Sequence, residues 1–225
     1  MTYKNYRYLC KDIEKLQELV TYFRLFGLIF GIHLLAVMSP GPDFVMVLKN
    51  ALQYKRKAAI YTALGIGLGI GVHILYSIAG VAYLLQKNQT LFYIVKIAGA
   101  LYIIYIGAKT FMSKQTQMKL DTSEKTTVLS PWQAVKTGFV TNVLNPKASL
   151  FFLSLFTLLI PPDIPVWVLT AISLMLITVT FLWFSLVSII FTNKRVVQSY
   201  EKYETYIVKV FGLLLIVLGI AVFFE

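Results

Sequence analysis

Two residues of opposite charge lie inside long apolar runs of the sequence, where a charge needs either a partner or a function. Asp43 is the only carboxylate well inside such a run, and Lys147 lies at about the corresponding depth of a later one. Even on a lenient scale, a lone charge at the centre of a bilayer costs at least about 2.5–3.5 kcal/mol. These two residues are therefore the first candidates for chemistry.

Three interpretations of this pair are open. Asp43 and Lys147 could form an ion pair that only stabilises the fold. Asp43 could instead bind an amine or a proton while Lys147 and exposed helix ends bind a carboxylate, which would suit an amino acid. Asp43 could also lie near the membrane surface, with its carboxylate reaching water.

Helix-breaking residues surround both charges. Ser39-Pro40-Gly41-Pro42 precedes Asp43, and Asn142-Val143-Leu144-Asn145-Pro146 precedes Lys147. A proline inside a helix removes a backbone hydrogen bond and clashes with the preceding turn, so we expect two broken helices. Simple proline kinks are the alternative. Unwound backbone at membrane depth must be buried in protein or line a watery cavity, so the paired breaks favour a central binding site.

The two histidines, His33 and His73, also lie within apolar runs and are candidates for proton handling. For His33 we favour a packing role, and for His73 packing and function are about equally balanced. Two histidines and one buried carboxylate make a poor metal site, and Cys10 is the only cysteine. We therefore expect no metal, no other cofactor and no intrachain disulfide.

The composition requires elements that can position these residues in a membrane. Of 225 residues, 58% are hydrophobic and 14% charged, against roughly 45–50% and 25% in soluble domains. At about 20 residues per spanning helix, the chain holds about six transmembrane helices and is an all-α integral membrane protein. The expected spans are 25–48, 58–85, 90–112, 132–160, 164–191 and 204–224, of which the first and fourth carry the breaks.

The two halves of the chain resemble each other. Val95-Lys96-Ile97-Ala98-Gly99 reappears as Val208-Lys209-Val210-Phe211-Gly212, and Ser39-Pro40 matches Asn145-Pro146. A polar loop at 113–131 separates repeat 1, at about 25–112, from repeat 2, at about 132–224. Because each half holds three spans, the second must be inverted relative to the first.

The charges predict the orientation of the chain. The net charge is +11, but Lys and Arg cluster between the apolar runs, as in cytoplasmic membrane loops, so we do not expect nucleic-acid binding. More of them follow spans one, three and five than lie on the opposite side, which favours both termini outside the cytoplasm. Residues 1–24 contain charges of both signs and are expected to form an amphipathic lead-in helix.

Glycines recur at every second position of the second expected span. Gly65 with Gly69, and Gly67 with Gly71, form two overlapping pairs of small residues at helical spacing. Such pairs let a neighbouring helix approach closely, so we expect a packing role. Small-residue faces of this kind would also permit a homodimer.

These motifs together resemble the LysE/RhtB family of amino-acid exporters. The resemblance covers about residues 27–224 and depends on four segments, 39–50, 63–73, 96–109 and 138–148, in the right order. It implies that residues 25–225 are a transporter domain of a bacterial inner-membrane protein that exports amino acids, driven by the proton gradient. With His73 added from its place in an apolar run, the candidate binding or coupling residues are Ser39, Pro40, Gly41, Pro42, Asp43, His73, Asn142, Asn145, Pro146 and Lys147.

Two other classes of function are the alternatives. An intramembrane enzyme would need a catalytic constellation, and the spans contain no Ser/His/Asp set, HExxH motif or paired carboxylate. We therefore expect no enzymatic activity. A membrane scaffold would need no polar, broken centre.

Overall fold

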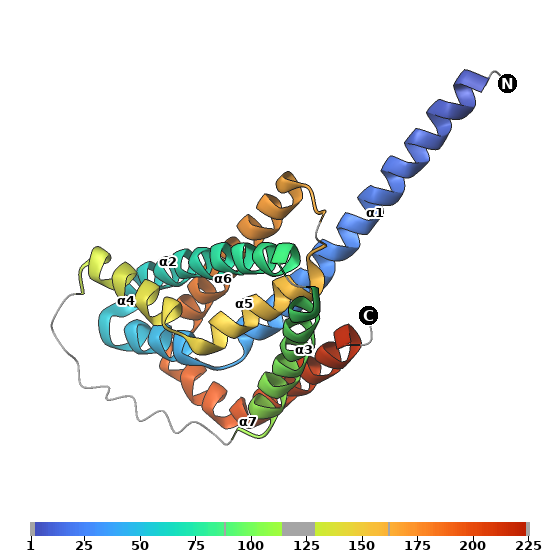
Figure 1. Ribbon diagram of the computed structural model, residues 1–225. Helices are drawn as coiled ribbons and strands as arrows, with labels where there is room; N and C mark the ends of the chain where they lie inside the picture. The colour runs from blue at the N-terminus through green and yellow to red at the C-terminus, as the bar shows by residue number, and fades with distance from the viewer. Residues whose placement is uncertain (1–2, 88, 114–128, 162, 224–225) are drawn as a thin grey trace.

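The computed structural model describes residues 3–87, 89–113, 129–161 and 163–223, and this part of the chain is helical throughout, without strands (Figure 1). The prediction of an all-α protein is confirmed. The helices are α1 (Tyr3–Met38), α2 (Pro42–Lys87), α3 (Gln89–Phe111), α4 (Pro131–Val143), α5 (Pro146–Leu159), α6 (Val166–Ile190) and α7 (Lys194–Phe223).

Several of these helices have the length and apolar character of membrane spans. Five segments meet that condition within the described residues: Lys15–Met38, Arg56–Tyr83, Gln89–Phe111, Val166–Ile190 and Lys202–Ala221. Helices α4 and α5 meet it together and are bent by 61° at the break between them. The expected six spans therefore correspond to five unbroken candidates and one bent pair, and the chain is a multi-pass membrane protein. The first candidate ends at Met38 rather than at 48, so the first break follows this span instead of dividing it.

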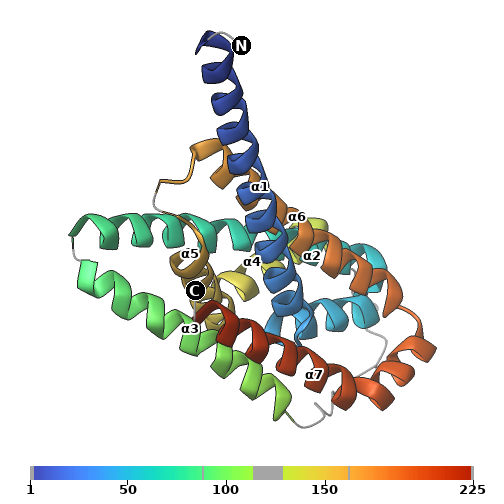
Figure 2. The same ribbon diagram turned by 90° about the vertical axis from the view of Figure 1, so that its right-hand side faces the viewer.

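The first helix is longer than expected. Helix α1 runs without a break from Tyr3 to Met38, so the described part of the lead-in and the first part of the expected span share one helix. Its N-terminal half projects away from the other helices in both views (Figures 1 and 2). The helix has no break near residue 25, where we expected the lead-in to end and the first span to begin.

The second helix contains the largest difference from the expected spans. We expected one span to end at 48 and the next to begin at 58, but α2 is continuous from Pro42 to Lys87. It nevertheless folds back, because Asn50 Nδ2 donates to Thr62 Oγ1 at 2.8 Å, whereas a straight helix would separate residues twelve apart by about 18 Å. The fold-back thus lies in the charged stretch between the two expected spans, and the next candidate span begins there, at Arg56.

The loop expected at 113–131 lies largely outside the described residues, and so do its charged positions between 114 and 128. Where the structure resumes, Ser130 caps α4. Its Oγ accepts from Gln133 N at 3.3 Å, and Gln133 Oε1 accepts from Ser130 N at 3.1 Å, a reciprocal capping box. Pro131 occupies the first helical position, where a missing N–H costs nothing.

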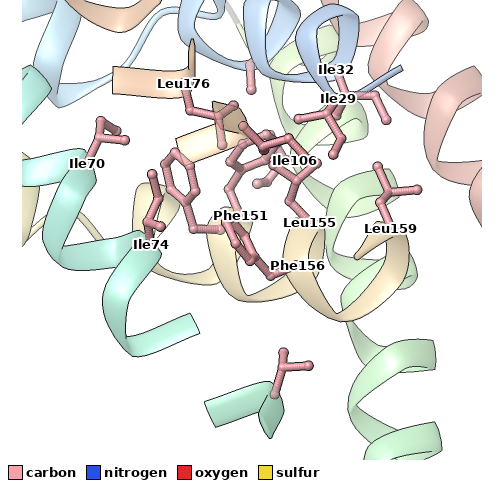
Figure 3. Close-up of a cluster of buried hydrophobic side chains, with 14 of the residues drawn as sticks. Ile29, Ile32, Ile70, Ile74, Ile106, Phe151, Leu155, Phe156, Leu159 and Leu176 are labelled. Atoms are coloured by element: carbon pink, nitrogen blue, oxygen red, sulfur yellow. The ribbon is translucent and has the colours of Figure 1, made fainter. Parts of the chain in front are cut away.

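Helix α5 lies at the centre of the bundle. Side chains of α1, α2, α3 and α6 meet those of α5, among them Phe151, Leu155 and Phe156 (Figure 3). Buried positions surround α5 on all sides, including Phe152, which is 1% exposed. A helix that is buried on most of its circumference is a core helix, and Lys147 in its first turn is half-buried.

The glycine pairs of the second expected span pack against two different helices. Gly65 contacts the Val135 carbonyl of α4, and Gly69 lies against the Asn142 side chain. Gly67 and Gly71 instead face Ile177 of α6. The predicted packing role is confirmed, and the close approach of α2 to α4 brings Asn142 beside the centre of α2.

Candidate functional site

The first break follows α1. Ser39 N still donates to Leu35 O at 3.1 Å, after which Pro40 and Gly41 leave the helix and Pro42 begins α2. Proline is favourable at this first helical position because its fixed φ suits the helix and its missing N–H is not needed. Asp43 therefore lies in the first turn of α2, where the positive end of the helix dipole favours a carboxylate.

The second break follows α4. Asn145 caps α5: its Oδ1 accepts from Lys147 N at 3.0 Å, and Pro146 occupies the first helical position. The NH2 group of the same Asn145 side chain takes no part in this cap and can donate to another residue. Both breaks thus combine a helix end, a proline and a charged residue, as the sequence predicted.

The Asp43 carboxylate connects the first break to the second. Its Oδ2 accepts from Asn142 Nδ2 and from Asn145 Nδ2, each at 3.0 Å. Its Oδ1 is buried and has no hydrogen-bond partner among the described residues. A buried carboxylate oxygen without a donor is costly, so this atom is suited to a donor that a ligand supplies.

The Lys147 ammonium connects the second break to the first. Its Nζ donates to Ser39 O at 3.1 Å, to Ser39 Oγ at 3.0 Å and to Pro40 O at 3.5 Å. These carbonyls lie at the negative end of the α1 dipole, which favours a cation. Asp43 and Lys147 thus have different hydrogen-bond partners in this structure, and neither is a partner of the other.

Ser39 has a further contact. Its Oγ lies 3.1 Å from Thr110 Oγ1 near the end of α3. Ser39 is 3% exposed and Asn145 is 4% exposed. Nothing in the sequence pattern around Thr110 indicated that it would meet the first break, because the contact spans 71 residues.

His73 lies behind the two breaks rather than in the open space between them. Its Nε2 lies 2.9 Å from Asn142 O, and because a carbonyl only accepts, Nε2 carries the proton. Its Nδ1 then accepts from the Tyr76 hydroxyl at 2.8 Å, and the ring stacks on Phe152 with an interplanar angle of 2°. Both nitrogens are satisfied, so His73 positions Asn142, which in turn holds Asp43.

His33 has the burial that the packing role favoured from the sequence requires, and it has a second feature. It is fully buried, as a packing residue would be, but it also lines the same cavity as Asp43. Its Nε2 lies 3.1 Å from Leu176 O and 2.9 Å from Thr180 Oγ1, both on α6. Its spacing of six residues before Ser39 was a signal that could have placed it near the break.

Two cavities flank the breaks. The inner cavity is lined by polar and charged residues from both breaks together with aromatic side chains of α5 and α6. A wider hollow is lined by Pro40, Pro42, Tyr102, Lys109 and Pro146, among others. Gly41, Asn145 and Lys147 line both. The Lys147 contacts to Ser39 and Pro40 therefore lie at the boundary between the two spaces.

The donor set does not suggest a metal. Among the described residues there is no group of three or more His, Cys, Asp or Glu side chains that could hold a metal ion. The site instead offers one carboxylate, one ammonium and several amide and carbonyl groups, which suits a ligand that carries both charges.

Broken helices around a polar cavity, within a bundle of apolar helices, are the arrangement of membrane transporters. The model of the LysE type translocator family matches residues 34–225, and the chain belongs to that family. The long N-terminal part of α1 before Leu34 lies outside the match.

Curated relatives agree with this family. The threonine efflux protein of Escherichia coli (strain K12) is 28% identical over 192 residues, covering 81% of this chain and 89% of the relative. An uncharacterized membrane protein of Bacillus subtilis (strain 168), YrhP, is 30% identical over 192 residues, covering 82% and 91%. One of Haemophilus influenzae is 25% identical over 193 residues, covering 84% and 90%. No solved structure matches the chain.

Proposed function

We propose that this protein is a secondary transporter that exports amino acids or close derivatives across the bacterial inner membrane. The observation that carries the proposal is the reciprocal contact of the two breaks, in which Asp43 binds the second break and Lys147 binds the first. The family and the threonine efflux relative support an amino-acid cargo. Threonine is accordingly the first substrate to test.

The site residues have separate roles in this proposal. The substrate ammonium binds Asp43 Oδ1, the acceptor that lacks a partner. The substrate carboxylate binds the Lys147 ammonium and displaces it from the Ser39 and Pro40 carbonyls. Asn142 and Asn145 hold Asp43 in place, His73 holds Asn142, and Pro40, Gly41, Pro42 and Pro146 keep the backbone open.

Release of these Lys147 contacts also suggests how access alternates. The bond from Lys147 to the first break lies between the inner cavity and the wider hollow. When a substrate carboxylate takes over the ammonium, Lys147 no longer ties the second break to Ser39 and Pro40, and the boundary opens at this point. Substrate binding and gate opening are then one event.

The two halves would rock against each other as inverted repeats. Helices α3 and α7, the third spans of the two expected repeats, lie side by side and antiparallel (Figure 2). They approach closely at Gly107 and Gly212, where an added Cβ at Gly107 would lie 2.9 Å from Gly212 O. Antiparallel contact between equivalent helices is what an inverted repeat requires.

Proton coupling, the orientation of the chain and a homodimer are further parts of the proposal. Asp43 would take up a proton outside and release it inside as the amino acid leaves.

The Lys and Arg distribution favours both termini outside the cytoplasm. Many exposed apolar side chains, such as Leu101 and Ile97 of α3, suit contact with lipid or with a second copy.

The test of the proposal uses cells that are loaded with amino acids by dipeptide feeding. Cells that express the protein should release threonine, or another amino acid of the panel, faster than cells without it. The Asp43→Asn variant at equal membrane abundance should abolish the difference, because the amide removes the negative charge that binds the ammonium. A membrane scaffold would tolerate this substitution with assembly intact. If no amino acid moves faster with the protein, the export proposal fails.

A further inference from the structure

We infer that His33 is a specificity-determining residue whose Nδ1 accepts a hydrogen bond from the substrate side chain, so that the site selects amino acids with a side-chain hydroxyl or N–H donor. This inference deepens the proposed function and depends on the same cavity. It assigns a role to His33 because the contacts with α6 use only Nε2 of its ring and leave Nδ1 without a partner among the described residues.

The tautomer of His33 follows from its contacts. Leu176 O can only accept, so the Nε2 atom at 3.1 Å from it must donate. Both polar neighbours of the ring, Leu176 O and Thr180 Oγ1, are uncharged, and a fully buried ring without a charged partner is neutral. Nδ1 therefore carries a lone pair, and it is buried without a hydrogen-bond partner in the part of the chain that the structure describes.

The position of His33 separates it from the groups that would bind the charged end of the substrate. His33 precedes Ser39 by six residues on α1, which corresponds to about 9 Å along the helix. Asp43 and Lys147 lie at the break itself. A bound amino acid that places its ammonium and carboxylate at the break would thus direct its side chain along α1 toward His33.

The walls between these two ends of the cavity are apolar. Ala36, Phe151, Phe152 and Phe184 line the same space as His33 and Asp43. An apolar substrate side chain would pack against these walls but would leave His33 Nδ1 without a hydrogen-bond donor. A side chain with a hydroxyl satisfies both, and a site built to bind a hydroxyl rejects an isostere that lacks one because its own polar group stays unpaired.

The experiment compares L-threonine with L-valine, which have nearly the same shape and differ by a hydroxyl and a methyl group. Purified protein in proteoliposomes should release threonine at least about tenfold faster than valine. In His33→Phe this ratio should fall to within about twofold. His33→Gln should keep the preference, because its amide can donate to Leu176 O and its carbonyl can accept from the substrate.

A second measurement separates recognition from export. Threonine should raise the unfolding temperature of the wild-type protein in detergent more than valine does, because a ligand stabilises the state it binds. That difference should disappear in His33→Phe. Ser188→Ala, which changes a buried hydroxyl of α6 outside the cavity, should leave both the ratio and the difference unchanged.

The outcomes distinguish the inference from the proposed function. Equal transport and equal stabilisation by threonine and valine in the wild type would overturn the role of His33 and leave amino-acid export standing. A His33→Phe variant that slows both substrates equally would make His33 a packing residue. Selective stabilisation by threonine without any transport would reject export but support recognition by His33.

Discussion

At the scale of single residues, Lys147 links the two breaks through three acceptors on the first one. Replacing Lys147 with glutamine removes the positive charge that binds these acceptors and, in the proposed function, the substrate carboxylate. Hydrogen bonds to a charged group contribute about 1.5–3 kcal/mol, so we expect threonine export to fall at least about tenfold. Lys136→Gln, on the exposed face of α4, is the matched control, and equal export by the two variants would contradict the role of Lys147.

His73 permits a second test at this scale, because it acts through Asn142 rather than on the substrate. In His73→Phe the ring still packs on Phe152, but Asn142 O loses its bond of 2.9 Å. We expect export to fall about tenfold, consistent with the loss of about 1–1.5 kcal/mol. Tyr76→Phe removes the donor to Nδ1 and the hydrogen bond of the same hydroxyl with Ser149, but leaves the bond to Asn142 O, and should have a smaller effect. A larger effect of Tyr76→Phe would show that His73 is held mainly from that side.

At the scale of helices, the contact between α2 and α4 sets the position of the second break. An added Cβ at Gly138 would contact Thr62 O directly, and one at Gly65 would contact Val135 O. Because neither backbone atom can move aside, Gly138→Ala should lower the unfolding free energy by about 1–3 kcal/mol.

Thermal unfolding in detergent measures this effect, and Gly31→Ala is its control. Gly31 has no atom within 4 Å of an added Cβ, and alanine is the better helix former by about 1 kcal/mol, so this variant should be as stable as the wild type or more so. If Gly138→Ala unfolds at the same temperature as Gly31→Ala, the close packing of α2 on α4 is wrong.

At the scale of the whole molecule, an even or odd number of membrane spans decides whether the two termini lie on the same side of the membrane. If the bent pair α4–α5 crosses the membrane, six spans place both termini on the same side, whereas a re-entrant pair leaves five spans and opposite sides. Cys10 is the only cysteine, so a membrane-impermeant maleimide should label it in intact cells. Glu225→Cys in a Cys10→Ser background should be labelled as well. Labelling of only one terminus would show that α4–α5 does not cross.

Proton coupling also belongs to the whole molecule, because it links Asp43 to both sides of the membrane. Collapse of the pH gradient with an ionophore should stop threonine export against a concentration gradient, while downhill exchange of labelled threonine continues. Proteoliposomes with an imposed pH gradient measure both modes. Uphill export that persists without the gradient would exclude protons as the coupling ion.

Properties that depend on neighbouring residues along the chain could be read from the sequence. Proline in an apolar run breaks the helix wherever the rest of the chain lies, so both breaks, at 39–41 and 144–145, fall where the sequence predicted them. The glycine spacing on α2 predicted close helix contacts for the same reason. Hydropathy also located the fold-back within α2, between the expected spans that end at 48 and begin at 58. It did not reveal that the helix assignment continues through this fold-back.

The partners of the charged residues were decided only by the tertiary structure. Asp43 binds Asn142 and Asn145, 99 and 102 residues away, and Lys147 binds Ser39 across 108 residues. The sequence left an Asp43–Lys147 ion pair open, because charge and depth alone do not say which groups meet. The place of His33 beside the cavity likewise depends on how α1 packs against α5 and α6. Local stereochemistry determined where the helices break, and long-range packing determined which groups the breaks bring together.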